Sequence, residues 1–344
     1  MKTKAIAPNM KKGAKMVDLH GKFPVMLTFD VDGEALWLAR DPKNSERLIT
    51  LSLGRYGPMT GVPKILALLR KWDIRATFFV PGWIADHHPD TIKAIDADGH
   101  EIGHHGYQHE RLEYLEPEQE EPILIKGIEA LERAVGTRPL GYRAPAWEMG
   151  PRTLPLLEKH GFRYSSNFMD ADGPYIHRSS PGGPGIVELP VEWTLDDTSL
   201  YLFSLQIQGS KIMPNAQVLD LWCGSFDGLY RDGGSCVLTL HPQLTGRSYR
   251  LAALEQFIAH ASKHADVVFV RCSDAADFFR ATDWRTSRQR SQTQQATATS
   301  TDDDREHDLR VTYEVDGRVV RVVRKKVSEK YRWYLIGNSS WREW

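Results

Sequence analysis

The segment Glu101–Glu110, read EIGHHGYQHE, carries two histidines whose spacing suits a shared metal ion. His105 and His109 are four residues apart, and on a helical turn such a pair lies on one face, so both imidazoles can reach one ion. Two nitrogen ligands are too few, because a catalytic metal also needs a hard third ligand and an open position. The pair therefore predicts part of a metal centre that an acid from elsewhere completes.

An acid for this centre stands at the end of the segment Val25–Glu34, read VMLTFDVDGE. Apolar residues run up to Asp30 and Asp32, as expected where a buried strand ends at the mouth of a sheet. Asp30 taken alone could cap a turn. Beside the two histidines, ligation by one of these acids is the better interpretation.

Two later segments supply the remaining groups that hydrolysis needs. The segment Gly141–Trp147, read GYRAPAW, offers Arg143, and Val237–Pro242, read VLTLHP, is an apolar run that ends in His241. Alone, Arg143 could form a surface ion pair and His241 could merely end a strand. A base, a metal centre, an orienting cation and an acid together indicate a hydrolase.

Length and composition limit the other classes of function. With 344 residues the chain can hold one large domain or two small ones around a substantial core. A net charge of −1 gives no electrostatic reason to expect nucleic acid or an acidic membrane surface. The three cysteines, Cys223, Cys236 and Cys272, follow no metal or redox spacing and suit a reducing compartment.

The sequence shows neither an export signal nor a membrane span. Its first residues are basic but lack the apolar stretch of a signal peptide, and no apolar run is long enough to cross a bilayer. We therefore predict a cytoplasmic enzyme with no nucleic-acid or membrane partner.

Strand and helix patterns alternate through most of the chain. Strands are predicted at residues 25–29, 76–80, 100–103, 140–143, 164–168, 186–190, 236–240 and 267–270. Helices are predicted at residues 60–72, 89–97, 118–135, 151–160, 217–230 and 251–264. This alternation favours an α/β fold with a parallel sheet wrapped by helices and, with this many units, a barrel; an open doubly wound sheet is the alternative. Residues 34–60 are predicted to form a polar, irregular insertion.

Composition divides the chain into four regions. Residues 1–22 are a polar lead-in, and residues 23–284 hold the alternating strands and helices. Residues 285–308 are polar low-complexity sequence that predicts a flexible linker. Residues 309–344 contain two β-rich runs around Asp316-Gly317, which is a strong hairpin signal, and a third run at 331–336. We expect a small C-terminal β appendage there.

The chain resembles the polysaccharide deacetylase superfamily, also called the NodB-homology or carbohydrate esterase 4 group. The resemblance covers roughly residues 20–282 and rests on four motifs in the family's order. These motifs are Thr28–Asp32 (TFDVD), His105–His109 (HGYQH), Arg143–Trp147 (RAPAW) and Leu238–His241 (LTLH). Each motif is weak by itself, but four in order are specific. The resemblance implies a distorted (β/α)7-type barrel.

The resemblance also implies the chemistry of the first two motifs. Asp30 is the expected catalytic base, while Asp32, His105 and His109 are the expected ligands of a divalent metal ion, with Zn²⁺ preferred. The usual first motif has adjacent acids, whereas Val31 separates them here. This variant is most similar to a subgroup that includes Helicobacter-type peptidoglycan deacetylases and bacterial cyclic imide hydrolases. The same subgroup implies a homo-oligomer, with a tetramer as the expected form.

The last two motifs supply the expected cation and acid. Arg143 is expected to pair with the base and fix its orientation, and His241 to protonate the departing nitrogen. The family's Asp-Trp pair that orients this histidine is not present as such. The segment Trp193–Asp197, read WTLDD, stands about where it should, so Asp196 or Asp197 is expected to take that role.

Four further residues are candidates for substrate contact. Tyr107, Trp147 and Trp193 could line a pocket, although an aromatic core is the default interpretation. Glu34 could contact substrate, and a solvated acid is an equal alternative. The metal and a backbone N–H near Tyr107 or in the adjoining loops are expected to hold the oxyanion.

The substrate is predicted to be a small amide or a cyclic imide. An enzyme that acts on wall or chitin-type sugars would usually be exported, and the insertion after Asp32 and the Pro/Gly-rich segment 174–185 could cover the site. N-deacetylation of an aminosugar polymer is the alternative. A third interpretation, a carbohydrate-binding relative without activity, is disfavoured because every acid and histidine is retained.

Overall fold

The computed structural model describes residues 17–178, 185–207 and 209–282, together with strands between residues 309 and 343. The chain divides into two compact units, Met1–Gln289 and Arg290–Trp344. Residues 1–16 of the predicted lead-in and the whole predicted linker, 285–308, lie outside the described residues.

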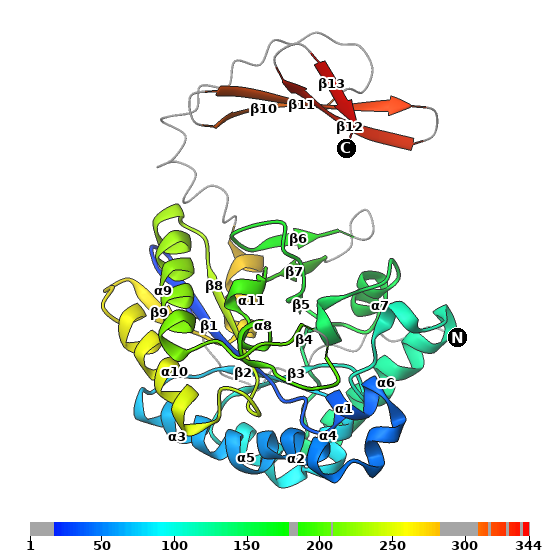
Figure 1. The fold of residues 1–344 in the computed structure, drawn as a ribbon, viewed down its shortest axis with the longest axis vertical. Helices are drawn as coiled ribbons and strands as arrows, with labels where there is room; N and C mark the ends of the chain where they lie inside the picture. Colours follow the sequence, from blue (N-terminus) through cyan, green and yellow to red (C-terminus); the bar gives the residue numbers. More distant parts are fainter. Residues whose placement is uncertain are drawn as a thin grey trace. The chain divides into compact units, whose positions relative to one another are not determined.

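The larger unit is built on one nine-stranded sheet (Figure 1). Its strands are β1 (Phe23–Asp30), β2 (Thr77–Val80), β3 (Glu101–His104), β4 (Gly141–Tyr142), β5 (Tyr164–Ser165), β6 (Tyr175–His177), β7 (Ile186–Glu188), β8 (Cys236–Leu240) and β9 (Val267–Phe269). Their order is β6-β7-β5-β4-β3-β2-β1-β8, with β9 beside β1, and only the β6–β7 pair is antiparallel. The order does not reverse as it does in a doubly wound sheet. The sheet is an open half-barrel, which confirms the predicted α/β barrel.

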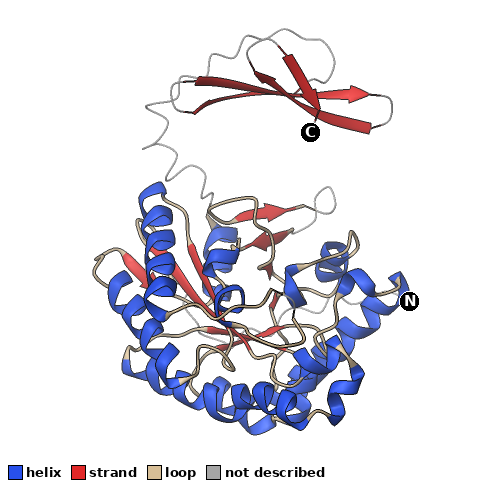
Figure 2. Cartoon of the chain, in the orientation of Figure 1, coloured by secondary structure: helices blue, strands red, loops and turns tan. Residues whose placement is uncertain are grey.

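Helices surround this sheet (Figure 2). They are α1 (Ala35–Arg40), α2 (Leu48–Tyr56), α3 (Val62–Lys71), α4 (Gly82–His87), α5 (Pro89–Ala97), α6 (Pro117–Val135), α7 (Thr153–Lys159), α8 (Asp197–Tyr201), α9 (Asn215–Asp232), α10 (Ser248–Ala261) and α11 (Cys272–Ala281). Short helical turns are η1 (Pro42–Glu46), η2 (Gly57–Gly61), η3 (Leu112–Tyr114), η4 (Pro145–Trp147) and η5 (Trp193–Leu195). Helices α4 and α8 and strand β6 were not predicted, since each is too short for a clear hydrophobic period. Helix α11 was also not predicted, although its ten residues are long enough to show such a period.

Strand β1 pairs with three other strands of the sheet, and all eight of its residues are buried. It pairs with β8 on one side and with β2 and β9 on the other. Helices cover the sheet, so the strand is buried on both faces, which explains its nearly unbroken apolar sequence, FPVMLTFD. Phe29 stacks on Phe78 of β2, with 4.8 Å between the ring centroids. This rigid strand fixes the position of Asp30 at its end.

The insertion over residues 34–60 is helical, and the prediction of an irregular segment was wrong. It forms α1, η1 and α2 and leads into η2, and Trp37 of α1 is 1 % exposed. The buried amide of Asn44 donates to the Trp37 carbonyl and joins η1 to α1. The helical period was hidden because α2 leaves Leu48 and Ile49 in solvent and has only Gly54 buried.

Gly54 of this insertion and Gly61, which follows it at the end of η2, permit close packing rather than turns. A Cβ on Gly54 would lie 2.3 Å from the carbonyl oxygen of Gly33, and one on Gly61 would lie 2.2 Å from that of Pro242. Gly33 follows β1 and Pro242 follows β8, so the insertion rests on both of these chain segments. Only glycine allows backbones to approach this closely.

The smaller unit is an antiparallel sheet of four strands in sequence order. These are β10 (Leu309–Val315), β11 (Arg318–Val327), β12 (Lys330–Gly337) and β13 (Ser340–Glu343). Val315 pairs with Arg318 at the end of the β10–β11 ladder, which confirms the predicted hairpin. The fourth strand was not predicted, because WRE is too short a run to stand out.

Replacing Gly54 by Ala tests the close approach of the insertion. We expect Gly54→Ala to lower the free energy of unfolding by about 1–3 kcal/mol, because the added Cβ meets a backbone oxygen that cannot yield easily. Gly224→Ala, an exposed helical position of α9 with open space around its Cβ, is the matched control and should raise stability by about 0.5–1 kcal/mol. Urea unfolding of both variants measures the difference, and equal stabilities would contradict the packing described.

Candidate active site

The predicted residues come together at one edge of the sheet. Asp30 ends β1 and Asp32 follows it, His105 follows β3, Arg143 follows β4 and His241 follows β8. The carboxyl ends of parallel strands meet at the same edge, which is where α/β enzymes place their reacting groups.

Asp32, His105 and His109 form a buried cluster that fits a metal ion. One ligand atom of each lies within 4.8 Å of the other two. Asp32 Oδ1 is 3.4 Å from His105 Nε2 and 3.6 Å from His109 Nε2, yet it has no hydrogen-bond partner among the described residues. A buried carboxylate oxygen without a donor, facing two imidazole nitrogens, suits a divalent cation.

The protonation of this cluster also suits a cation. His105 Nδ1 lies 2.8 Å from the Arg143 carbonyl oxygen, which can only accept a hydrogen bond, so Nε2 is left to face Asp32. Burial lowers the pKa of His109 to about 4, which keeps its imidazole neutral at pH 7. Burial opposes the charge of Asp32, but the neighbouring His109, His241 and His105 outweigh it and lower the pKa of this carboxyl. Burial opposes protonation of His105, but the neighbouring carboxylates of Asp30 and Asp32 outweigh burial and raise its pKa. A divalent ion that binds here would take the place of that proton and leave one carboxylate and two neutral imidazoles, the forms that metal ligation requires.

The two histidines are brought together by a loop, and the prediction of a helical turn was wrong. Residues 105–110 are not helical, and His109 has a φ of 60°. The Glu110 carboxylate accepts hydrogen bonds from the backbone N–H of Tyr107, at 2.9 Å, and of Gln108, at 2.8 Å. The Tyr107 N–H already has an acceptor, which speaks against the oxyanion contact predicted there.

Arg143 holds Asp30 in a fully buried ion pair. Its Nη1 donates to Asp30 Oδ1 and to Thr28 Oγ1, each at 2.8 Å, and its side chain is 0 % exposed. Nη2 and Nε donate to the hydroxyl and the carbonyl of Ser166. Asp30 Oδ2 therefore faces the cluster, 3.9 Å from His105 Nε2 and 4.0 Å from His241 Nε2. One oxygen of the carboxylate is fixed, and the other points to where a substrate would react.

His241 is oriented by Asp197. Its Nδ1 lies 2.7 Å from Asp197 Oδ1, and its backbone N–H donates to Asp197 Oδ2 at 3.0 Å. Asp196 instead accepts from the Thr198 N–H at 2.6 Å and caps α8, with its Oδ1 3.9 Å from His241 Nδ1. The geometry thus favours Asp197 between the two predicted candidates.

The proton state of His241 follows from these contacts. Burial disfavours the imidazolium, but the charges of Asp32 and Asp197 outweigh burial and raise the pKa of His241. With Nδ1 committed to Asp197, Nε2 faces Asp32 Oδ2 at 3.6 Å. A protonated Nε2 that faces the cluster is what a general acid needs.

Trp147 and Trp193 form an aromatic pair. Their ring centroids are 4.6 Å apart at 47°, and Trp147 is buried whereas Trp193 is 48 % exposed. Ala146 and Trp147, three and four residues after Arg143, have unusual φ values of 56° and 59°. Such strain persists only where the surroundings hold it, and it is frequent beside functional groups.

The other two residues predicted to contact substrate, Tyr107 and Glu34, form hydrogen bonds with side chains of the protein. The Tyr107 hydroxyl donates to Asp86 of α4 at 3.2 Å, so this side chain is bound to the surrounding helices. Glu34 is buried and accepts from Arg55 Nε at 3.2 Å, and its other oxygen lies 3.1 Å from His88 Nε2. Glu34 thus joins α2 to the chain segment after β1.

Gln243 is a site residue that the sequence motifs did not reveal. Its Nε2 donates to Asp32 Oδ2 at 3.4 Å, and it is 5 % exposed. Its Oε1 has no hydrogen-bond partner in the part of the chain that the structure describes. The signal that could have found it is its place two residues after His241, on the same turn of chain.

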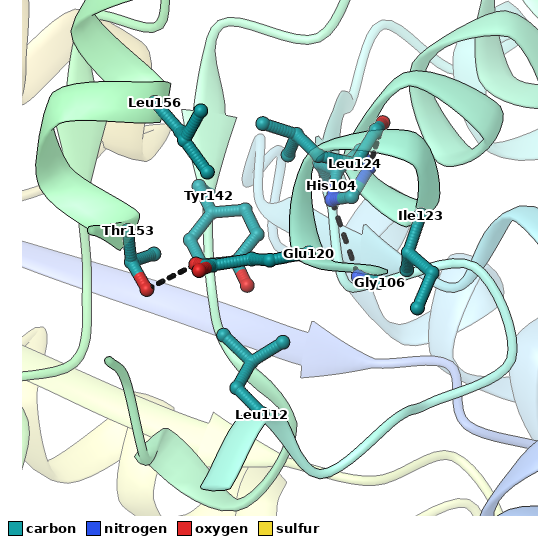
Figure 3. Close-up of a pocket in the computed structure, with 9 residues that line it drawn as sticks. All are labelled: His104, Gly106, Leu112, Glu120, Ile123, Leu124, Tyr142, Thr153 and Leu156. Carbon is teal, nitrogen blue, oxygen red and sulfur yellow. Dashed lines mark hydrogen bonds between the residues drawn. The ribbon is translucent and has the colours of Figure 1, made fainter. Parts of the chain in front are cut away.

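A small pocket lies behind the histidine loop (Figure 3). It is lined by His104, Gly106, Leu112, Glu120, Ile123, Leu124, Tyr142, Thr153 and Leu156. His104 fixes the loop from this side, because its Nδ1 accepts from the Gly106 N–H and its Nε2 contacts the Leu124 carbonyl oxygen. None of the predicted catalytic or metal-binding residues lines it, so this pocket is not the place of the chemistry.

Comparison with known proteins identifies the family. Residues 20–165 match the family model described as polysaccharide deacetylase. The peptidoglycan deacetylase of Helicobacter pylori is 32 % identical over 276 residues, which is 73 % of this chain and 94 % of that protein. A solved structure from Mycobacterium smegmatis, assigned by name to the polysaccharide deacetylases, is 43 % identical with a TM-score of 0.74 and covers 78 % of this chain and 94 % of its own. A solved allantoinase is 28 % identical with a TM-score of 0.67, over 80 % of this chain and 99 % of its own.

Fold and site together define a hydrolase that acts on carbon–nitrogen bonds other than peptide bonds. The chain belongs to the polysaccharide deacetylase family. Within the described residues, no helix has both the length and the apolar sequence needed to cross a membrane.

Asp32→Ala tests the assignment of the metal ligands. We expect the unaltered chain to keep a divalent ion at this cluster through desalting and the variant to lose it, because the only carboxylate of the buried cluster is removed. Elemental analysis of desalted protein measures this loss. Asp98→Ala, which removes a surface carboxylate paired with Arg70, is the control and should keep the ion. An unchanged metal content in Asp32→Ala would show that these ligands are wrongly assigned.

Arg143→Lys tests the orienting role of the guanidinium. A lysine cannot reach all four acceptors, so we expect kcat to fall about 10²-fold and the free energy of unfolding to fall by about 1–3 kcal/mol. Steady-state kinetics and urea unfolding measure the two effects. Arg163→Lys, which changes the pair with Asp277 on α11, is the matched control and should keep kcat. Full activity in Arg143→Lys would refute the role.

Proposed function

We propose that this protein hydrolyses a small amide or a cyclic imide, with a divalent ion held by Asp32, His105 and His109. Zn²⁺ is the ion that this set of one carboxylate and two imidazoles favours. The peptidoglycan deacetylase and the allantoinase to which the chain is similar both support a hydrolase of this type.

The proposal of a small substrate rests on the burial of the site residues. Asp30, Asp32, His105, His109 and His241 are each no more than 6 % exposed. The helical insertion packs against the chain after β1 and after β8, beside these residues. A polymer needs an open groove in which several units can lie, whereas an enclosed site with a few convergent polar groups suits a small molecule. The allantoinase, which matches over 99 % of its own chain, is an enzyme named for a small substrate.

In the proposed hydrolysis of the amide, Asp30 acts as the base and His241 as the acid. A divalent ion, when bound, supplies a Lewis acid that polarises the scissile carbonyl and acidifies water. Asp30, held at Oδ1 by Arg143, presents Oδ2 to take a proton from the attacking water. His241, held at Nδ1 by Asp197, presents Nε2 to give a proton to the departing nitrogen. One water is consumed, and the carbon–nitrogen bond is replaced by a carboxylate and an N–H.

The alternative is N-deacetylation of an aminosugar polymer. The similarity to a peptidoglycan deacetylase over 94 % of that protein favours it. So does Trp193, whose half-exposed ring packs on Trp147 and could support a sugar ring. A carbohydrate-binding protein without activity is disfavoured, because the base, the acid and their orienting partners are all in place. A cytoplasmic location and a homo-oligomeric, tetrameric state stay predictions from the sequence.

Parallel assays of two substrates test the proposal. Succinimide and an N-acetylglucosamine oligomer are each incubated with Zn²⁺-loaded and with chelated full-length protein. We expect ring opening of the imide that is lost on chelation, with no acetate released from the sugar. Asp30→Asn, which keeps the size of the side chain but removes the base, should abolish turnover while it retains the ion.

Each other outcome has a definite meaning. Acetate release without imide turnover would replace the proposed substrate with the aminosugar polymer. Imide turnover that survives chelation would overturn the metal assignment. Turnover of neither substrate would contradict both proposed substrate classes.

A further inference from the structure

A second group of potential metal ligands lies on the outer helices of the larger unit. Asp227 comes from α9, His260 from the last turn of α10, and His264 from the turn that follows α10. One ligand atom of each lies within 4.8 Å of the other two. The three residues belong to neither the metal-binding cluster nor the base and acid of the candidate active site.

The backbone places the two histidines on one side of α10. His260 and His264 are four residues apart, and the helical coil continues beyond α10 because the Lys263 N–H donates to the His260 carbonyl and the His264 N–H to the Ala261 carbonyl. His264 is therefore stacked one turn beyond His260. Asp227 meets them from α9, with its Oδ1 2.7 Å from His260 Nε2.

The aromatic rings of Phe226 and Tyr230 pack against the imidazoles of His260 and His264. The buried ring of Phe226 lies 5.7 Å from His260 and 5.5 Å from His264 between centroids. The ring of Tyr230 lies 4.3 Å from His264, and its hydroxyl donates to Asp266 at 2.6 Å. Phe226 and Tyr230 stack on each other one turn apart on α9. These contacts restrict the rotamers of both histidines before any ligand binds, which lowers the entropic cost of binding.

An ion pair alone explains only part of this arrangement. It accounts for Asp227 and His260, which touch, but not for the convergence of His264 on the same point. Two imidazoles and one carboxylate are donors that favour Zn²⁺, Ni²⁺, Cu²⁺ or Co²⁺ over Mg²⁺ or Ca²⁺. The Asp227 side chain is 52 % exposed and that of His260 28 %, so an ion can enter from solvent and water can complete its coordination.

We propose that Asp227, His260 and His264 bind a divalent transition-metal ion that links α9 to the end of α10. The inference does not rest on the proposed substrate, because these residues take no part in the hydrolysis. An ion bound only by the folded chain raises stability in proportion to its concentration above the dissociation constant. Bound here, it ties together the successive helices α9 and α10.

The decisive experiment removes the buried cluster first. Untagged full-length Asp32→Ala protein is titrated with Zn²⁺ by calorimetry and with Co²⁺ by visible absorption. We expect one equivalent to bind and the melting temperature to rise with Zn²⁺. Adding His264→Ala to this variant should weaken binding at least tenfold and remove the rise in melting temperature.

Matched control variants distinguish Zn²⁺ binding at this site from nonspecific Zn²⁺ binding to surface histidines. Adding His87→Ala to the Asp32→Ala chain removes an exposed histidine of α4 that bonds the Trp83 carbonyl, and binding should be unchanged. In the otherwise unaltered chain, Zn²⁺ should bind at two equivalents, and at one in His264→Ala, which keeps the test valid if Asp32→Ala folds poorly. The proposal is overturned if the Asp32→Ala chain binds no ion, or if His264→Ala leaves the affinity unchanged.

Discussion

The buried guanidinium of Arg143 is the constraint on which the active-site geometry depends. A charge with no exposure to solvent is tolerated only when it is paired and its donors are satisfied. Here the guanidinium bonds Asp30, Thr28 and Ser166, which lie on or after β1 and β5. The carbonyl of the same residue sets the tautomer of His105, which follows β3. Arg143 thereby fixes the proposed base, one proposed metal ligand and the spacing of the strand ends that carry them.

The contact between Asp197 and His241 fixes the proposed acid, as the contact between Arg143 and Asp30 fixes the proposed base. Asp197 holds both the backbone and the ring of His241, so its two oxygens are fully used. Asp32 differs, because its Oδ1 faces imidazole nitrogens and receives no hydrogen bond from the described residues. Hydrogen bonds from the described residues occupy both oxygens of Asp197 but one oxygen each of Asp30 and Asp32. Asp30 bonds a guanidinium, whereas the other oxygen of Asp32 faces two imidazoles. These contacts, rather than residue type, support the proposed roles of base, metal ligand and orienting group.

The sequence was informative where burial forces a local pattern. Strands buried on both faces read as apolar runs, so the positions of Asp30 and His241 at their ends could be predicted. The sequence was uninformative where contacts in the folded chain decide which of several candidate residues enters the site. Asp196 and Asp197 are adjacent, and only the turn into α8 shows which one faces His241.

Two other misses have the same physical origin. The spacing of His105 and His109 fits a helix, yet Glu110 holds the segment as a loop by accepting two backbone N–H groups. Helix α2 leaves Leu48 and Ile49 in solvent, and Gly54 looks like a turn former although it serves close packing against Gly33. Local rules cannot distinguish these cases, because the deciding contact comes from another part of the chain.

The two groups of His and Asp side chains show why a donor set does not by itself define a catalytic metal centre. Each consists of one carboxylate and two imidazoles with ligand atoms within 4.8 Å. Around Asp32 all three residues are buried, and a base and an acid face them within 4.0 Å. Around Asp227 the donors are exposed or half-buried and lie beside the rings of Phe226 and Tyr230. The first arrangement can activate water against a substrate, whereas the second can only hold an ion and, through it, two helices.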